Sequence, residues 1–396
     1  MIKNNQILIL LLGIAVALRL VLAVTTYHSD LGAFAQAGRA IAGENKWLSF
    51  YDTMLTPKID TVFNYQPLAY LIPSIFYLPF RGIVMETGNL VKDHDWIVSN
   101  PSVFNPLLLI YKYPMILADL AFLWLLPKFF SRKKEKKTAM LLWAFNPLAI
   151  FVSSMMGQVD IIIALFITAG LYLYQKEKPF LSVLLIALSA LIKPAGLILI
   201  PILALHYLAT EKKLFQSILL GITGFGVYLL GILPYLGSAT YRHYALFAEQ
   251  IGKSTYAAIS IASGHDIPLF FIIYALILIL VWQKRLSFFT AVSAALLSTL
   301  AFSHFHPQWL VWIMPWLVIY SVSKSDYLLY FVSLVCWLFV LFAFDPSLHL
   351  QIFIHSSLAL PSSITTSSYF LELVQMSRAG LIATLIYLLM ERNEAN

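Results

Sequence analysis

Long apolar runs separated by short basic loops constrain this chain more than any other feature. Hydrophobic residues make up 60% of it and charged residues only 11%. A run of about 20 apolar residues can cross the hydrocarbon core of a membrane as a helix. A membrane β-barrel would instead show short segments of alternating hydropathy. The pattern therefore predicts an all-α polytopic membrane protein, and it excludes a soluble globular domain and a disordered chain.

The positions of Lys and Arg predict the topology. Basic residues cluster at 131–137, 176–178, 211–213 and 284–285, and placing these loops in the cytoplasm gives a consistent threading. The net charge of +7 is explained by these loops, so it does not indicate nucleic-acid binding. We expect about ten to twelve transmembrane helices. The predicted crossings are 6–26, 105–128, 138–156, 160–175, 214–236, 266–283, 287–303, 310–323, 326–345 and 373–391.

Two apolar segments do not fit simple spans. Residues 67–84 contain three prolines, and we expect them to be re-entrant or to lie on the membrane surface. Residues 180–209 are too long for one span and too short for two, and Lys193-Pro194 interrupts them. We expect a half-deep hairpin with Lys193 near its tip. Irregular backbone at that depth is tolerated only against protein or a water-filled cavity.

The chain is predicted to form one transmembrane domain over residues 1–396. It divides into a long external loop with juxtamembrane helices (27–104), a core helical bundle (105–345), and an external loop with a final transmembrane helix (346–396). The single cysteine, Cys336, lies in an apolar run, so no disulfide framework is expected.

Asp30 lies where the first span leaves the membrane, followed by GAFAQAGRAIAGEN, which reads as an amphipathic surface helix. An acid at this position is costly unless it is used. It could act as a general base or a metal ligand, although a helix cap would also explain it. His28 would face the same side in an extended turn, which suits a pair of metal ligands or an ordinary interfacial histidine.

Polar side chains recur at two other external turns. Gln158 and Asp160 close the segment GQVD; they could contact sugar hydroxyls, and Asp160 could also cap the following helix. The segment HFHPQW supplies His304, His306, Gln308 and Trp309. Protonated histidines can bind phosphate, and indole rings stack on sugar faces. An aromatic belt at the membrane interface is the alternative explanation.

Cations and acids inside the apolar runs call for partners. Arg19 and Asp119 lie within the first and second spans, and we expect them to pair. Lys193 has no acid near it in sequence, which makes it a candidate for binding the phosphate of a lipid. Arg242 and His243 in an external loop are weaker candidates for the same role.

Nucleotide and hydrolase motifs are absent from the sequence: there is no P-loop, no GxGxxG after a strand, no HExxH and no GxSxG. The cytoplasmic loops are only a few residues long. A cytosolic nucleotide-sugar donor is therefore not expected, and a membrane-embedded activated lipid fits better.

The order of short motifs resembles GT-C glycosyltransferases that use polyprenyl-phosphate sugars, and most of all the mannosyltransferase that adds the first mannose to glycosylphosphatidylinositol. The resemblance covers about residues 6–320. It starts with an acid after the first span. The later motifs are FAQAGR, YQPLAYL, LADLAFLWLL before a basic loop, WAFNPLAIFVSS with GQVD, LIKPAGLILIP and PQWLVWIMPW.

The resemblance implies that Asp30 activates the acceptor hydroxyl. It also adds Tyr65 and Gln66 of YQPLAYL to the predicted sugar-binding residues His28, Gln158, Asp160, Gln308 and Trp309. One departure is clear: the family's Asp-x-Asp appears here as His28-Ser29-Asp30. A divalent metal is therefore possible but not required, and no other cofactor is expected.

The sequence thus predicts a glycosyltransferase acting outside the cytoplasm, with Asp30 as base and with Lys193, His304 and His306 on the leaving phosphate. Its partners would be a polyprenyl-phosphate-linked sugar, a glycan or glycolipid acceptor and membrane lipids, and no nucleic acid. The expected location is the plasma membrane of a prokaryote or the endoplasmic reticulum of a eukaryote. The alternatives are a transporter or lipid-linked-sugar flippase, and a non-catalytic membrane subunit.

Overall fold

The computed structural model describes residues 4–55, 61–248, 256–262, 264–303, 306–358 and 360–390. It confirms the predicted all-α polytopic membrane protein. In the described part of the chain, six helical stretches are long and apolar enough to cross a membrane, or seven if one bent pair counts as a single span. The six are Gln6–Thr25, Leu68–Thr87, Pro101–Phe129, Pro194–Glu211, Leu214–Tyr235 and Ser368–Met390.

Four of these stretches correspond to predicted crossings, whereas Leu68–Thr87 and Pro194–Glu211 fall in the two segments that were not predicted as simple spans. The six stretches are built from helices and the short η turns that extend them. They are α1 (Asn4–Thr25), α3 (Leu68–Tyr77), η3 (Leu78–Phe80), α4 (Arg81–Thr87), α6 (Pro101–Leu125), η5 (Leu126–Phe129), η7 (Pro194–Ile198), α11 (Leu199–Glu211), α12 (Leu214–Ile232), η8 (Leu233–Tyr235) and α19 (Ser368–Met390).

The bent pair and the shorter apolar helices complete the bundle. The axis turns by 47° between α7 and the segment formed by α8 and η6, where Asn146 caps α8 by accepting a hydrogen bond from the backbone of Ala149. These helices are α7 (Lys133–Ala144), α8 (Pro147–Ile150), η6 (Phe151–Met156), α9 (Asp160–Gln175), α10 (Pro179–Ala190), α14 (Leu269–Trp282), α15 (Phe288–Phe302), α16 (Met314–Lys324) and α17 (Leu328–Phe342).

The remaining elements are short and lie mostly in the connections. An antiparallel hairpin of β1 (Ala258–Ala262) and β2 (His265–Pro268) precedes α14, so the helix starts later than the predicted crossing at 266. The others are α2 (Asp30–Gly38), η1 (Arg39–Gly43), η2 (Phe50–Thr53), η4 (Leu90–Lys92), α5 (His94–Ser99), α13 (Ala239–Tyr241), η9 (Arg242–Leu246), η11 (Pro307–Trp312), η12 (Pro346–Leu348), η13 (Leu350–Ile352) and α18 (Ser362–Thr365).

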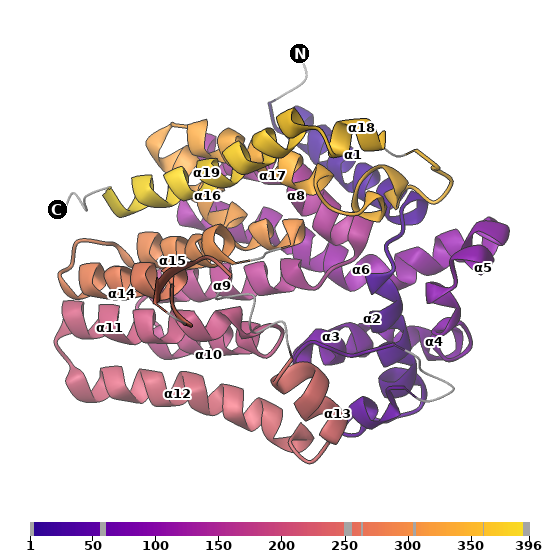
Figure 1. Cartoon of the computed structure of the whole chain (residues 1–396), viewed down its shortest axis with the longest axis horizontal. Helices are drawn as coiled ribbons and strands as arrows, with labels where there is room; N and C mark the ends of the chain where they lie inside the picture. The colour runs from indigo at the N-terminus through magenta and orange to yellow at the C-terminus, as the bar shows by residue number, and fades with distance from the viewer. Residues whose placement is uncertain are drawn as a thin grey trace.

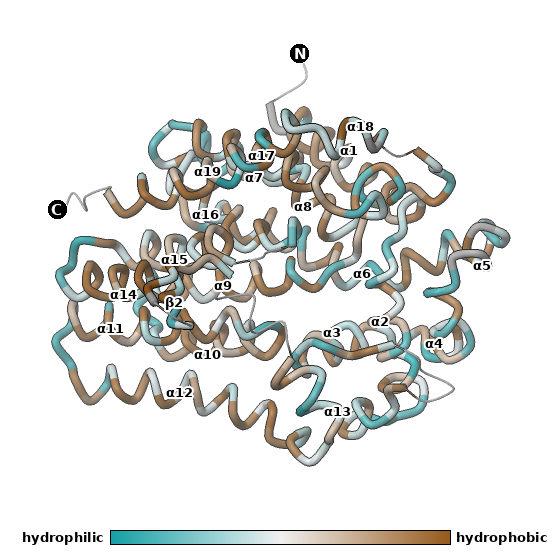
Figure 2. The backbone as a smooth tube through the Cα atoms, in the orientation of Figure 1, coloured by the Kyte–Doolittle hydropathy of each residue, from teal (hydrophilic) through white to brown (hydrophobic). Residues whose placement is uncertain are grey.

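The bundle has two distinct ends. In Figure 1 the turn between α11 and α12 and the turn between α14 and α15 lie at the left, and both carry the basic residues assigned to the cytoplasm. At the right lie α2, α4, α5, α13 and α18. Figure 2 shows apolar residues along most helices and hydrophilic residues mainly in the connections. This arrangement agrees with a threading in which the long N-terminal loop faces away from the basic turns.

The predicted pair of Arg19 and Asp119 is confirmed. Nε of Arg19 lies 2.7 Å from Oδ2 of Asp119, and both side chains are fully buried. Asp119 also accepts hydrogen bonds from the indole of Trp143 and the hydroxyl of Ser153, at 2.8 and 2.7 Å. The charges are thus paired and hydrogen-bonded, the condition under which ionic groups persist in a low-dielectric interior.

The prediction that the segment after Asp30 is an amphipathic surface helix is wrong. In α2 and η1 nearly every residue is buried, including Phe34, Gln36 and Ile41. Its Ala and Gly residues let neighbouring elements approach on more than one side. A Cβ on Gly38, for example, would lie 2.6 Å from the ring of Tyr77 in α3. The small residues therefore indicated close packing rather than a solvated face.

The two irregular segments are helical. Residues 67–84 fall within α3, η3 and α4, and this run is itself long and apolar enough to span a membrane, so its expected re-entrant or surface position remains a prediction. Residues 180–209 fold back as α10 and α11 around an extended Lys193, whose φ and ψ are −141° and 139°. The turn of Lys193 contacts the start of α3, since Leu68 N donates to Leu191 O at 2.9 Å.

Candidate active site

Asp30 is the first residue of α2 and follows shortly after the end of α1. Its side chain is 41% exposed, whereas Leu31 beside it is fully buried. Its Oδ2 accepts a hydrogen bond of 2.6 Å from Nε2 of Gln158. A carboxylate in the first turn is also stabilised by the N-terminus of its helix. The carboxylate is therefore fixed in place yet reachable, as a general base must be.

Gln158 is positioned by a sharp turn after η6. Gly157 has φ +73° and ψ 44°, a left-handed conformation that favours glycine. A Cβ there would lie 2.8 Å from Lys112 Cγ and 2.9 Å from Leu31 Cδ1. The turn buries Gln158, and its Oε1 has no hydrogen-bond partner in the described part of the chain. A buried amide oxygen with no hydrogen-bond partner is uncommon in proteins and often marks a functional site.

His28 and Asp30 face the same side, as the sequence predicted. The backbone N–H of Asp30 donates to Nδ1 of His28 at 3.3 Å, and Nδ1 lies 3.6 Å from Oδ2 of Asp30. Burial lowers the pKa of His28 below its usual 6.5. The imidazole is therefore neutral at pH 7, with its proton on Nε2. Nδ1 thus already accepts one hydrogen bond, and the use of His28 and Asp30 as a pair of metal ligands stays a prediction.

A metal site is not supported by the remaining acids and histidines. Among the described residues no group of three His, Cys, Asp or Glu side chains is placed to hold a metal ion.

Asp160 and Lys193 form a buried ion pair. Nζ of Lys193 lies 2.9 Å from Oδ1 and 2.8 Å from Oδ2 of Asp160, and Trp312 Nε1 donates to Oδ1 at 2.9 Å. Asp160 is the first residue of α9, and the N-cap position before it is occupied by Val159, which has no capping side chain. The carboxylate of Asp160 is thus held by Lys193 and Trp312, which are distant from it along the chain.

Aromatic rings surround the ammonium group of Lys193. Nζ lies 4.5 Å from the ring centre of Tyr65 and 5.5 Å from that of Trp309. Trp309 stacks on Trp312 at 5.3 Å. Cations over aromatic faces are stabilised by the ring quadrupole, and flat rings of this kind also bind sugar faces. The predicted residues Tyr65, Asp160, Lys193 and Trp309 thus come together.

Tyr65 also packs against α2, the helix that begins at Asp30: its ring stacks on that of Phe34, with ring centres 6.1 Å apart. Burial raises the pKa of the Tyr65 hydroxyl well above its usual range, and the negative charges of Asp30 and Asp160 raise it further. Both carboxylates therefore lie within electrostatic range of one phenol. The hydroxyl remains protonated at neutral pH and can donate a hydrogen bond.

Sequence reasoning missed Lys112. It is fully buried in α6, and its Nζ donates to Ala23 O, Thr26 O and Met155 O at 3.1, 2.6 and 2.7 Å. These carbonyls lie at the ends of α1 and η6, where helices leave acceptors unsatisfied. The available signal was a lysine inside a predicted span, which in lipid usually marks a functional or structural site.

Gln66 and Gln308 are both buried but differ in their contacts. The amide of Gln66 donates to Ala245 O at 3.1 Å and accepts from the Tyr241 hydroxyl at 2.7 Å, so it holds η9 in place. Oε1 of Gln308 has no hydrogen-bond partner among the described residues. Of the two, only Gln308 has a buried amide oxygen that is unpaired within the described part of the chain.

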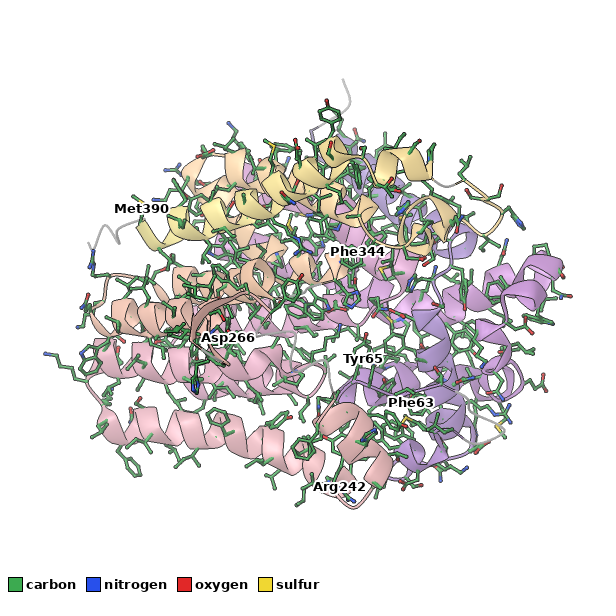
Figure 3. All side chains as sticks on the ribbon, viewed as in Figure 1. Phe63, Tyr65, Arg242, Asp266, Phe344 and Met390 are labelled. Atoms are coloured by element: carbon green, nitrogen blue, oxygen red, sulfur yellow. The ribbon has the colours of Figure 1, made fainter. Side chains whose placement is uncertain are left out.

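The predicted phosphate-binding residues do not all gather at one place. His306 contacts the rings of Trp309 and Phe344 at 5.7 Å each, which brings it near the aromatic cluster. His304 lies outside the described residues. Arg242 and His243 are exposed on η9, and Figure 3 shows Arg242 at the lower edge of the molecule, apart from Tyr65. The structure therefore groups His306, but not Arg242, with Lys193.

Comparison with known proteins supports a mannosyltransferase. Residues 96–209 match the family described as alpha-(1->6)-mannopyranosyltransferase, N-terminal domain. The match covers less than a third of the chain and includes Asp119, Asp160 and Lys193. No curated protein and no solved structure matches the chain. The predicted resemblance to mannosyltransferases is confirmed, and glycosyltransferase activity is supported.

Proposed function

We propose that this protein transfers a sugar, with mannose favoured, from a polyprenyl-phosphate donor to a glycan or glycolipid acceptor on the extracytoplasmic side of the membrane. The observation that carries the proposal is the Asp30 carboxylate, which is accessible and oriented by Gln158. Its helix, α2, packs through Phe34 on Tyr65, which lies over the ammonium group of Lys193.

In the proposed reaction, Asp30 accepts the proton of the acceptor hydroxyl. The acceptor oxygen attacks the anomeric carbon, the bond from that carbon to the phosphate oxygen breaks, and polyprenyl phosphate leaves. Negative charge grows on the phosphate in the transition state, and fixed cations there lower the barrier. An ammonium group has three N–H donors. Two of those of Lys193 meet Asp160, and the third can meet the phosphate, with His304 and His306 as further donors.

The decisive experiment supplies the purified protein, in lipid nanodiscs, with a panel of polyprenyl-phosphate sugars and a glycan acceptor. Release of polyprenyl phosphate together with an extended glycan supports the transferase. Movement of intact donor between leaflets without release would support a flippase, which the bent helix at α7 and α8 and the break at Lys193 also suit.

The general-base role of Asp30 is tested in the same assay. We expect Asp30→Asn to reduce transfer about 10²- to 10⁴-fold, the usual contribution of acid–base catalysis. The matched control is Asp326→Asn, which changes an exposed acid between α16 and α17. An Asp30→Asn protein with wild-type turnover would rule out Asp30 as the base.

A further inference from the structure

A hollow lies beside Asp30. Of the residues that line it, the sequence predicted a role in substrate binding only for His28. Its volume is about 430 Å³, within the range of pockets that bind small ligands. One side is the junction of α1 and α2, and the other is the loop 347–357. Polar lining residues include His28, Ser29, Ser347, Gln351, Ser356 and Ser357.

The loop is fastened to the chain that leads into Asp30. Tyr27 N donates to Ile352 O at 2.7 Å, and Ile354 N donates to Thr25 O at 3.1 Å. These bonds form an antiparallel bridge between Thr26 and Phe353. The hollow and the catalytic carboxylate are therefore parts of one hydrogen-bonded unit, so a ligand held by the loop has a fixed position relative to Asp30.

The chemistry of the lining suits a carbohydrate. Hydroxyls and one amide can donate and accept hydrogen bonds, which sugar hydroxyls require, and Ile97 and Ile354 add apolar surface for C–H groups. Lys92 carries the one full charge among the lining residues that the structure describes, none of which is acidic. His28, which is also a wall, lies 3.6 Å from the Asp30 carboxylate. A hydroxyl bound on the His28 side would thus be near the base.

We propose that this hollow binds the glycan of the acceptor and presents one of its hydroxyls to Asp30, with Gln351 and the serines of the loop 347–357 determining acceptor affinity. The proposal rests on the proposed function, and it gives the segment after residue 346 a part in substrate binding. The donor then occupies the other side, at the cluster of Tyr65, Lys193 and Trp309.

Two variants test the hollow. Gln351→Ala removes a hydrogen-bonding group, and Ser357→Trp fills the space from an exposed position. We expect Gln351→Ala to raise the acceptor KM about three- to tenfold, the effect of one lost hydrogen bond, and Ser357→Trp to raise it more. The donor KM should not change. The controls are Gln283→Ala, in the turn after α14, and Ser363→Trp, on α18; both positions are exposed and outside the hollow.

The acceptor is supplied in two forms, a water-soluble mannose oligosaccharide and a glycolipid carrying the same glycan. Equal increases in KM for both support recognition of the glycan. Unchanged acceptor KM in both variants, or an increase confined to the donor, would overturn the proposal.

A binding experiment separates the proposed acceptor site from the proposed transferase function. Saturation-transfer NMR measures binding of the soluble oligosaccharide to the protein in the absence of any donor. Binding that is lost in Ser357→Trp and kept in Ser363→Trp supports the hollow as a glycan-binding site. If the same protein turns over no donor, the proposed function is rejected and the glycan-binding site is not. A wild-type protein that transfers sugar, with oligosaccharide binding unaffected by Ser357→Trp, would reject the hollow alone.

Discussion

The imidazole of His28 gives the site a defined response to pH. Burial holds its pKa below 6.5, so above that value it is neutral and accepts the N–H of Asp30. As pH falls through the lowered pKa, protonation removes this acceptor and places a positive charge near the carboxylate. If Asp30 is the base, both effects weaken it, so activity falls on the acid side. Stability falls in the same direction, because the unfolded state binds the proton more readily.

We therefore predict that log kcat/KM declines below an inflection under pH 6.5 and that His28→Asn, whose amide oxygen can replace Nδ1 as acceptor, removes the inflection. The measurement is a pH–rate profile between about pH 5 and 8. His243→Asn is the control, since His243 is exposed. An inflection that persists in His28→Asn would assign it to another group.

Lys193 has two proposed roles, pairing with Asp160 and binding the donor phosphate, and these roles can be tested separately. Removing one partner of a buried pair typically costs about 3–5 kcal/mol. We predict that Lys193→Met lowers the unfolding free energy by an amount of this order, and that the double variant Lys193→Met/Asp160→Asn recovers part of it. Denaturant or thermal unfolding in detergent measures both. No recovery in the double variant would show that the pair is not the source of the loss.

The kinetic role of Lys193 has its own signature. If Lys193 and His306 hold the donor phosphate, Lys193→Ala and His306→Ala raise the donor KM more than the acceptor KM. Apparent KM values for each substrate in both variants decide this. An increase confined to the acceptor would reject the phosphate assignment, and unchanged kinetics with a lower melting temperature would leave Lys193 a structural role only.

Sequence reasoning identified the ionisable residues more reliably than their partners. Arg19 and Asp119 could be paired in advance because each lies within an apolar span, where an unpaired charge is costly. The partner of Lys193 could not be fixed, because Asp160 is on another helix and the contact depends on how α9 packs against the turn after α10. Gln66 lies next to Tyr65 in sequence, yet adjacent side chains point in different directions, and Gln66 faces η9.

At the scale of elements, Lys112 of α6 holds the end of α1 and the end of η6 together by hydrogen bonds beside the candidate site. We predict that Lys112→Met destabilises the protein by about 1–3 kcal/mol for the carbonyls left unsatisfied. We also expect it to lower kcat, because Gly157, which precedes Gln158, packs closely against both Lys112 and Leu31, the neighbour of Asp30. Unfolding and transfer assays measure the two effects. Lys134→Met, on the exposed start of α7, is the control.

A Lys112→Met protein with wild-type stability and turnover would show that the three carbonyls find other donors. A loss of stability with normal kcat would confine Lys112 to holding the helices together. Only a fall in kcat at a temperature where the variant is fully folded supports its positioning role.

Hydropathy predicted the long helices well but said little about packing between them. The boundaries of α1, α6, α9 and α12 lie within a few residues of the predicted crossings, because burial in lipid requires an uninterrupted apolar run. The burial of α2 and the docking of the loop 347–357 on residues 25–27 were not predicted. Both depend on contacts between distant segments, which leave no periodic pattern in the sequence.

For the whole molecule, the separation of basic turns from the candidate site predicts which surfaces face the cytoplasm. Asp160 itself cannot report on this, because it is fully buried. Exposed residues can report which side of the membrane they face. Lys134, Glu177 and Lys212 lie in or near the basic turns, and Arg242 and Ser357 lie on the side of the candidate site. Cytoplasmic loops carry the excess of Lys and Arg, so the first three positions should be inside and the last two outside.

We predict that single cysteines at 242 and 357, in a Cys336→Ser background, react with a membrane-impermeant maleimide on intact cells. Cysteines at 134, 177 and 212 should react only after permeabilisation. The Cys336→Ser protein without an added cysteine gives the background. Because Asp30 and Ser357 belong to one hydrogen-bonded unit, labelling of 357 only from the cytoplasm would place the carboxylate there too. That result would contradict transfer on the extracytoplasmic side, while leaving the roles of Asp30 and the hollow to their own tests.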